Sequence, residues 1–362
     1  MDQNSSFALR GFLPAEDPLT HFEADSELAC LDTLGRDLPS LLHDRVFRAY
    51  ARTLRIPKLP SLVIPIPVIR LYYVRIGFLA SAYINQVGEE PMKVLPQNIA
   101  VPLVDVCRRL GRPPILSYDG YALYNWKRFN PKAPIALGNI DTIQNFVHLY
   151  DEHWFILVHV EIEVLASRLL ASIFAAESAL AQQDQGGVDQ ALRQLVEVVW
   201  EQVRVLRRIP EKMDPGLYYK TFRPYIRFFE DVVYEGVDTA PMSFRGETGA
   251  QSSVIPALVS FLKVPHKPSM LTNHLADMRR FMPPEHRDLL LRIERMPSVR
   301  DLADKATYNE ALEALAAFRE VHLGFARDYI ARWVDDPRGT GGTPYLEWLG
   351  QLVDETREFK SS

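Results

Sequence analysis

The segment 151–182 constrains the fold most, because it contains neither proline nor glycine. A run of this length predicts one continuous helix, which at about 1.5 Å per residue would be roughly 48 Å long and would cross an entire domain. Its most apolar part, Trp154–Ala175, does not predict a membrane span, because it carries side chains that are costly in hydrocarbon. These are His159, Glu161, Glu163 and Arg168. We therefore expect a core helix and no membrane partner.

The rest of the C-terminal half is also typical of helices, and strand signals are almost absent from it. Several helices are expected to begin at or near proline. The predicted ranges are 188–209, 254–262, 271–281, 284–295 and a second long one, 307–334. This pattern favours a mainly α fold, with a helical bundle that holds its working site between facing helices.

The first hundred residues differ, because prolines punctuate them and four fall within 56–69. Proline interrupts a helix, so short helices joined by extended segments are expected there. A helical pattern covers 70–86, and Asn98 is suited to cap a helix over 100–110. The segment 115–127 predicts a short strand or turn.

The composition excludes several kinds of partner. Hydrophobic residues make up 47% of the 362 residues, enough for a large core. The net charge of -5 provides no basic surface, so we expect no nucleic-acid partner. The two cysteines, Cys30 and Cys107, are too few for a disulfide framework. The N-terminus lacks the pattern of a secretory signal, and we expect a cytoplasmic location.

His322 is a candidate ligand in the second long predicted helix. Apolar side chains share its helical face at spacings of three, four and seven residues, namely Leu315, Phe318, Phe325, Ala326 and Tyr329. The imidazole should point inward, and Gly324 leaves room for a flat macrocycle beside it. A core histidine bonded to a carbonyl is the alternative, and the spacing alone does not decide between the two.

His159 lies on an apolar face of the first long helix, with Glu163 one turn further on. A simple pairing of the two side chains is one interpretation. No His-Glu-x-x-His spacing links the histidines and no cysteine is near in sequence, so zinc is disfavoured. One ligand from each of two helices in an apolar bundle is compatible with haem.

Arg223 follows Tyr218, Tyr219 and Phe222 closely, and on a helix it shares a face with Tyr219. An arginine among aromatic rings suits a ligand with a carboxylate and a flat ring system, because guanidinium binds carboxylate in a bidentate pair. The alternative is an arginine stacked on tyrosine at the protein surface.

Two segments are rich in small residues. The segment 338–344 (RGTGGTP) predicts a mobile loop whose amides and hydroxyls fold over an anion, or an ordinary linker. It is not a phosphate-binding loop, since the following lysine is missing. The segment 244–253 (FRGETGAQSS) lacks the G-x-S-x-G form of a serine hydrolase.

Short blocks along nearly the whole chain carry a resemblance to a known family. They are GFLP from Gly11, LPQNIAVPL from Leu95, PPILSYDGYALYNWK from Pro113, FRPYI from Phe222, VYEGV from Val233, FRGETGAQSS from Phe244, DMRRFMPPEHR from Asp277, PSVRDL from Pro297, FREVHL from Phe318 and GTGGTP from Gly339. In this order they resemble the indoleamine 2,3-dioxygenase family.

The resemblance implies a haem-dependent dioxygenase with haem b held by His322, the histidine of FREVHL. It implies a small mixed α/β domain (1–145) and a large helical haem domain (146–362). The implied substrates are L-tryptophan and molecular oxygen, and the product is N-formylkynurenine of the kynurenine pathway. A monomer is expected.

The resemblance also implies a substrate pocket above the haem. The matching residues are Phe155, Tyr218, Tyr219 and Arg223, with Arg223 on the substrate carboxylate, Tyr118 at one side, Thr248 near the amino group or the haem edge, and Thr340 and Gly341 in a lid loop. His159 stands where vertebrate members have a distal serine, and would accept the indole N–H.

Two further departures concern the pocket and the proximal side. Tyr218 and Tyr219 replace phenylalanines that are usual in vertebrate members, and Val259 replaces an acid. The pocket should therefore be more polar, and a carboxylate that tunes the proximal histidine is not expected at Val259. The rival readings are a dioxygenase of another indole derivative in secondary metabolism, a non-catalytic haem-binding sensor or carrier, and a helical scaffold without cofactor.

Overall fold

The computed structural model describes residues 3–60, 63–333 and 345–360, and over these residues the fold is mainly α, as the sequence predicts. The uninterrupted segment forms α6 (Tyr150–Ala181), which ends where Gln183 adopts a positive φ of 54°. Within the described part of the chain, no helix combines the length and the apolarity that a membrane span needs.

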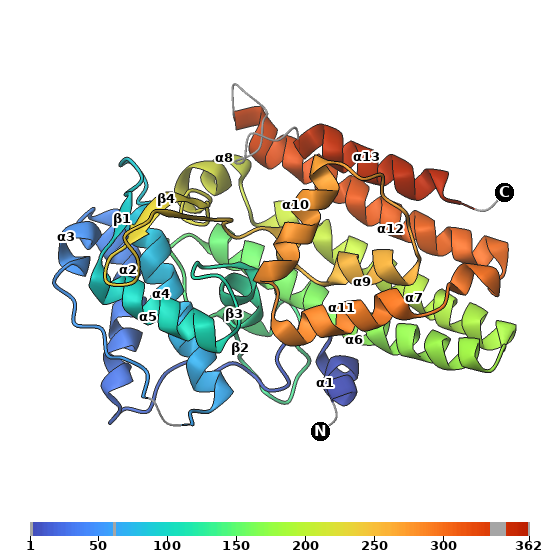
Figure 1. The fold of residues 1–362 in the computed structure, drawn as a ribbon, viewed down its shortest axis with the longest axis horizontal. Helices are drawn as coiled ribbons and strands as arrows, with labels where there is room; N and C mark the ends of the chain where they lie inside the picture. Colours follow the sequence, from blue (N-terminus) through green and yellow to red (C-terminus); the bar gives the residue numbers. More distant parts are fainter. Residues whose placement is uncertain (1–2, 61–62, 334–344, 361–362) are drawn as a thin grey trace.

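Long helices lie side by side in the right-hand part of Figure 1. α6 packs along α7 (Gln185–Leu206), which in turn packs on α12 (Lys305–Phe325). α13 (Tyr345–Glu358) covers the outer side of α12. The sequence patterns predicted α7 and α12 but not α13. The other helices of this part are α9 (Val254–Phe261), α10 (Met270–Met278) and α11 (Pro284–Arg295).

Apolar faces of these helices form one continuous core. Its fully buried members come from α6, α7, α9, α11 and α12, and include Leu169, Ile173, Leu192, Val199, Leu258, Leu290, Leu312 and Leu315. Burying one such side chain stabilises the fold by about 1.5–3 kcal/mol. This core holds α6 and α12 in place on the two sides of α7.

The N-terminal part packs around a second core, at the left of Figure 1. Its helices are α2 (Cys30–His43), α3 (Phe47–Ala51), α4 (Ile66–Ile84) and α5 (Gln97–Arg109), while α1 (Gln3–Arg10) packs on α6. The expected N-cap of α5 is wrong. Pro96 occupies that position, and the Asn98 amide instead donates to the carbonyl oxygens of Ala51 and Leu54, both at 2.8 Å.

Short strands complete this part. β2 (Trp126–Arg128) and β3 (Ile140–Thr142) form an antiparallel pair. β1 (Val94–Leu95) pairs in parallel with β4 (Phe229–Tyr234), and β4 pairs antiparallel with β5 (Met242–Phe244). Residues from the second half of the chain thus contribute to the N-terminal core. The division at residue 145 stays a prediction.

Within the part of the chain that the structure describes, three turns have the wide π-helical form, Asp119–Leu123, Tyr218–Phe222 and Ala326–Ile330. The third corrects the predicted helix 307–334, because the α-helical part ends at Phe325 and a 3-10 turn, Ala331–Trp333, follows. Such turns are frequent at functional sites. A short helix, α8 (Pro215–Leu217), leads directly into the second.

Candidate active site

His322 lies on α12 and is exposed, yet it sits deep enough among its neighbours to be desolvated. Burial, and after it the repulsion that a protonated His159 would exert, lowers the pKa of His322 to about 4, so the imidazole is neutral near pH 7. It makes no hydrogen bond with any described residue. The alternative of a core histidine bonded to a carbonyl is therefore wrong.

The surroundings of His322 are apolar, and the helix surface at Gly324 is open. A Cβ atom built at Gly324 would meet no atom within 4 Å. Phe318, Val321 and Phe325 border an apolar cluster that reaches across to Val158 and Ile162 of α6. A neutral imidazole that borders an apolar cluster and has no hydrogen-bond partner among the described residues fits a haem ligand.

The available metal-ligating side chains also indicate which kind of metal group could bind at His322. Among the residues that the structure describes, no three or more histidine, cysteine, aspartate or glutamate side chains are placed to hold a metal ion together. An iron at His322 would therefore take its other ligands from a macrocycle. The residues present fit a haem and not a multi-ligand zinc or di-iron centre.

α6 presents Phe155, His159 and Glu163 at four-residue spacing, so the three lie along one face. The His159 Nδ1 atom is 2.7 Å from the Phe155 carbonyl oxygen. Because a carbonyl only accepts, Nδ1 carries the proton and Nε2 is left as an acceptor. Burial lowers the pKa of His159, which keeps the ring neutral.

Glu163 does not pair with His159, so that interpretation is wrong. Its Oε1 atom accepts hydrogen bonds from the Tyr118 hydroxyl at 2.7 Å and the Ser252 hydroxyl at 2.6 Å. Burial raises the pKa of Glu163 to about 7. The Gln251 amide adds a second link, because its Oε1 atom accepts from the Tyr118 backbone N–H at 2.9 Å. This network joins α6 to the segment 244–253.

Aromatic rings line the space beside His159. The Tyr118 and His159 ring centroids are 5.9 Å apart, and those of Phe155 and Tyr218 are 5.5 Å apart. Tyr218 also contacts Tyr329, with centroids 5.8 Å apart. The predicted residues Tyr118, Phe155 and Tyr218 are therefore brought together around His159. The π-helical turn that begins at Tyr218 presents its ring to α6.

Arg223 follows this turn, and its guanidinium lies over the Tyr219 ring at 5.1 Å from the centroid. The Arg223 side chain is half-buried and makes no ion pair with a described residue. The alternative interpretation predicted an arginine stacked on tyrosine at the protein surface. The stacking is present, but the Arg223 side chain is partly enclosed. Tyr219 stacks in turn on Trp333, at 6.3 Å between centroids.

Tyr345 is a candidate that the sequence patterns did not reveal. Its buried hydroxyl has no hydrogen-bond partner among the described residues. Burial raises the pKa of Tyr345, and the nearby charge of Arg223 opposes this effect in part. The residue opens α13, which was not predicted, so only its position after the segment GTGGTP hinted at a role.

Thr248 uses its hydroxyl locally, because Oγ1 accepts from the Ala250 N–H at 3.3 Å and caps a short 3-10 turn. Its assignment near a substrate amino group stays a prediction. Thr340 and Gly341, predicted as lid contacts, lie outside the described residues.

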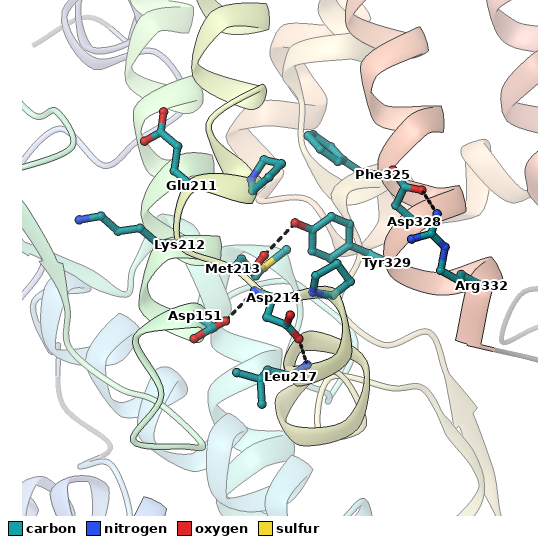
Figure 2. A pocket seen from close by; sticks show the side chains of 12 residues that line it. Asp151, Glu211, Lys212, Met213, Asp214, Leu217, Phe325, Asp328, Tyr329 and Arg332 are labelled. Carbon is teal, nitrogen blue, oxygen red and sulfur yellow. Dashed lines mark hydrogen bonds and ion pairs between the residues drawn. The ribbon is translucent and has the colours of Figure 1, made fainter.

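A separate pocket of about 620 Å³ lies between the ends of α6 and α7 and the C-terminal end of α12 (Figure 2). Charged side chains such as Asp151, Lys212 and Asp328 line it, and the Tyr329 hydroxyl donates to the Met213 carbonyl at 2.8 Å. Tyr329 also packs on Tyr218 and so stands between this open, charged pocket and the aromatic site. The open pocket does not suit an apolar macrocycle.

Comparison with known proteins places the chain in a family. The family model described as indoleamine 2,3-dioxygenase matches residues 5–336. The chain belongs to the indoleamine 2,3-dioxygenase family. This membership makes it a dioxygenase, an oxidoreductase of a family that acts on indoles and depends on haem.

Three relatives illustrate how much the names of similar proteins differ. Indoleamine 2,3-dioxygenase 2 of Mus musculus is 32% identical over 89% of this chain and 86% of its own length. The 6-hydroxytryptophan 2,3-dioxygenase of Fusarium equiseti is 28% identical over 96% of this chain and 95% of its own length. A myoglobin of Haliotis diversicolor is 25% identical over 97% of this chain and 96% of its own length.

Proposed function

We propose that this family member is a haem dioxygenase that cleaves the C2–C3 bond of L-tryptophan to give N-formylkynurenine. The observation that carries the proposal is Arg223, a half-buried guanidinium without an ion pair among the described residues, at the edge of an aromatic pocket that contains His159. A ligand with one carboxylate and one flat ring system that carries an N–H complements these groups.

The haem would be held by His322 and would supply the activation of molecular oxygen. Both oxygen atoms enter the product, so no net electrons are consumed. The protein's own residues bind and orient the amino acid. Arg223 pairs with the carboxylate, and the Phe155 and Tyr218 rings enclose the indole. The free Nε2 of His159 accepts the indole N–H.

Two further predicted residues, Tyr118 and Tyr219, make contacts that support the proposal. Tyr118 closes the pocket beside His159 and is held there by Glu163 and Gln251. Tyr219 supports the Arg223 guanidinium. Thr248 would lie near the substrate amino group, and Thr340 and Gly341, outside the described residues, stay predicted substrate contacts. We further propose that the protein works as a cytoplasmic monomer.

A second candidate is a dioxygenase of another indole derivative. The hydroxyls of Tyr218 and Tyr219 stand where vertebrate members usually have phenylalanine, and the Fusarium relative is named for 6-hydroxytryptophan. A polar pocket wall favours an indole that carries an additional hydroxyl.

The test is turnover by the haem-loaded protein of L-tryptophan, 6-hydroxytryptophan, tryptamine and indole, with products identified by mass. The proposal expects L-tryptophan to have the highest kcat/KM and to gain both atoms of labelled oxygen. A higher kcat/KM for 6-hydroxytryptophan would favour the second candidate. Stable oxygen binding without any product would instead indicate a non-catalytic haem-binding sensor or carrier.

A further inference from the structure

We propose that Trp333 is a positioning residue that holds the Arg223 guanidinium at the substrate site through the ring of Tyr219. This inference rests on the proposed function, in which Arg223 pairs with the substrate carboxylate. It adds a residue to which the sequence patterns gave no role. Trp333 would thereby favour indoles that carry a carboxylate over indoles that lack one.

A row of aromatic and cationic side chains joins Trp333 to Arg223. The Trp333 and Tyr219 ring centroids are 6.3 Å apart, and the two ring planes differ by only 17°. The guanidinium carbon of Arg223 lies over the Tyr219 ring at 5.1 Å from its centroid. At the other end of the row, the Lys220 ammonium nitrogen lies over the Trp333 ring at 4.9 Å. Ring faces attract cations and stack on one another, so each member stabilises the next.

The Trp333 indole is itself fixed by its surroundings. Its Nε1–H group donates to the Asp328 carbonyl oxygen at 3.3 Å. A Cβ atom built at Gly216 would come within 2.9 Å of the Trp333 Cη2 atom, so the ring lies directly against α8. A residue with a side chain at position 216 would displace the ring. The row of contacts therefore starts from a ring that the backbone on both sides holds in place.

Trp333 also belongs to the stretch of chain that follows the proposed haem ligand. It ends the 3-10 turn Ala331–Trp333, which comes after α12 and the π-helical turn Ala326–Ile330. The turn Ala326–Ile330 packs against α8 and against the π-helical turn that carries Tyr219. The contact between Trp333 and Tyr219 thus connects the end of the haem helix to the segment that leads into Arg223.

A contact through a ring face leaves the guanidinium able to bind a carboxylate. Carboxylates pair with the in-plane N–H groups of arginine, which a cation–π contact does not require. Arg223 is half-buried and forms no ion pair with a described residue. Fixing a free arginine side chain upon binding costs conformational entropy, and a side chain already held in place avoids part of that cost. Loss of the Trp333 ring should therefore weaken only those ligands that use Arg223.

The experiment measures binding of three ligands to the haem-loaded protein with oxygen excluded, by isothermal titration calorimetry. L-tryptophan and indole-3-propionate carry a carboxylate, whereas tryptamine does not. We expect Trp333→Leu, which keeps an apolar side chain but removes the ring face, to weaken the first two by about threefold to tenfold. Tryptamine binding should change by less than about twofold. In turnover, the KM for L-tryptophan should rise by a similar factor, while kcat changes by less than about twofold.

Matched variants separate positioning from general stability. Trp333→Phe retains a ring and should keep most of the affinity. Gly216→Ala leaves the indole intact but displaces it, and should weaken the same two ligands. In the Arg223→Ala protein, Trp333→Leu should cause no further loss, because Trp333 acts through that guanidinium. Trp200→Leu removes another partly buried tryptophan, which packs on the helical core, and should change no affinity.

Three results would overturn the role of Trp333: unchanged binding of all ligands in Trp333→Leu, equal weakening of all three, or a full additional loss in the Arg223→Ala protein. If Trp333→Leu does not fold, as judged by gel filtration and the Soret band, the same comparison of ligands in Gly216→Ala decides. Failure of the wild-type protein to bind any indole, or unchanged L-tryptophan affinity in Arg223→Ala alone, would instead overturn the proposed function.

Discussion

The two walls of the site use their polar groups in different ways. The α12 wall offers one unpaired imidazole, His322, among phenylalanines, with open space at Gly324. The opposite wall, made by α6 and the segment 244–253, is a connected network. The Tyr118 and Ser252 hydroxyls both donate to Glu163 there, and His159 is fixed by a backbone carbonyl.

This difference indicates a division of labour. An isolated neutral imidazole in an apolar setting is suited to hold a cofactor and does little to choose a substrate. A network of oriented donors and acceptors costs more to assemble but positions each group within a fraction of an ångström. We therefore expect substitutions in the α12 wall to affect retention of haem, and substitutions in the opposite wall to affect substrate selection and local stability.

The largest expected effect is the loss of haem in His322→Ala, because the variant lacks the imidazole that the proposed function assigns to the iron. Haem per protein, measured from the Soret band after gel filtration, should fall close to zero. His159→Ala serves as the control from the opposite wall and should retain haem. A similar loss of haem in both variants would contradict the division of labour between the two walls.

Arg223→Ala should leave haem content unchanged and raise the KM for L-tryptophan by about tenfold to a hundredfold. A hydrogen bond to a charged group contributes about 1.5–3 kcal/mol. Steady-state kinetics measures the effect. The control is Arg227→Ala, an exposed arginine four residues further on that lies near Phe228. An unchanged KM in Arg223→Ala would remove that residue from the substrate site.

Tyr118→Phe should lower the free energy of unfolding by about 1–3 kcal/mol, because the buried Glu163 carboxylate loses one of its two donors. Urea denaturation of the haem-loaded protein measures the difference. Tyr50→Phe, at an exposed tyrosine on α3, should change the free energy by less than about 0.5 kcal/mol. Equal effects would show that the network does not stabilise its wall.

The smallest effect concerns the His159 Nε2 atom. If it accepts the indole N–H, 1-methyl-L-tryptophan should react more slowly than L-tryptophan by up to about tenfold, since a neutral hydrogen bond contributes about 0.5–1.5 kcal/mol. His159→Ala should narrow this ratio, with the kcat/KM of each substrate as the measurement. A ratio that the variant leaves unchanged would show that the indole nitrogen is not read by His159.

Much of the helical fold and the central site residues were predictable. An uninterrupted apolar pattern predicts α6 and α12 because helices depend on local spacing. The same spacing placed His322 and His159 on inward faces. β4 was not predicted, because its ladder partner, β1, lies far away in the sequence and a short apolar run does not distinguish strand from helix.

The hydrogen-bond partners of the polar side chains were harder to predict from the sequence. Glu163 is one turn from His159, which suggested a local pair, but Tyr118 and Ser252 reach it from other elements. Tyr345 carries no periodic signal, and it becomes a candidate only because its buried hydroxyl has no hydrogen-bond partner among the described residues. Such an absence is a property of three-dimensional packing.

The sequence by itself determined the family, the long helices and the candidate ligand, because each depends on residue types at short or recognisable spacings. Tertiary structure decided which polar atoms are satisfied. Among the described residues, it left the His322 imidazole without a hydrogen-bond partner and gave the Glu163 carboxylate two donors. Hydrogen bonds and desolvation act between neighbours in space, and the neighbours of these side chains come from segments that only the folded chain brings together.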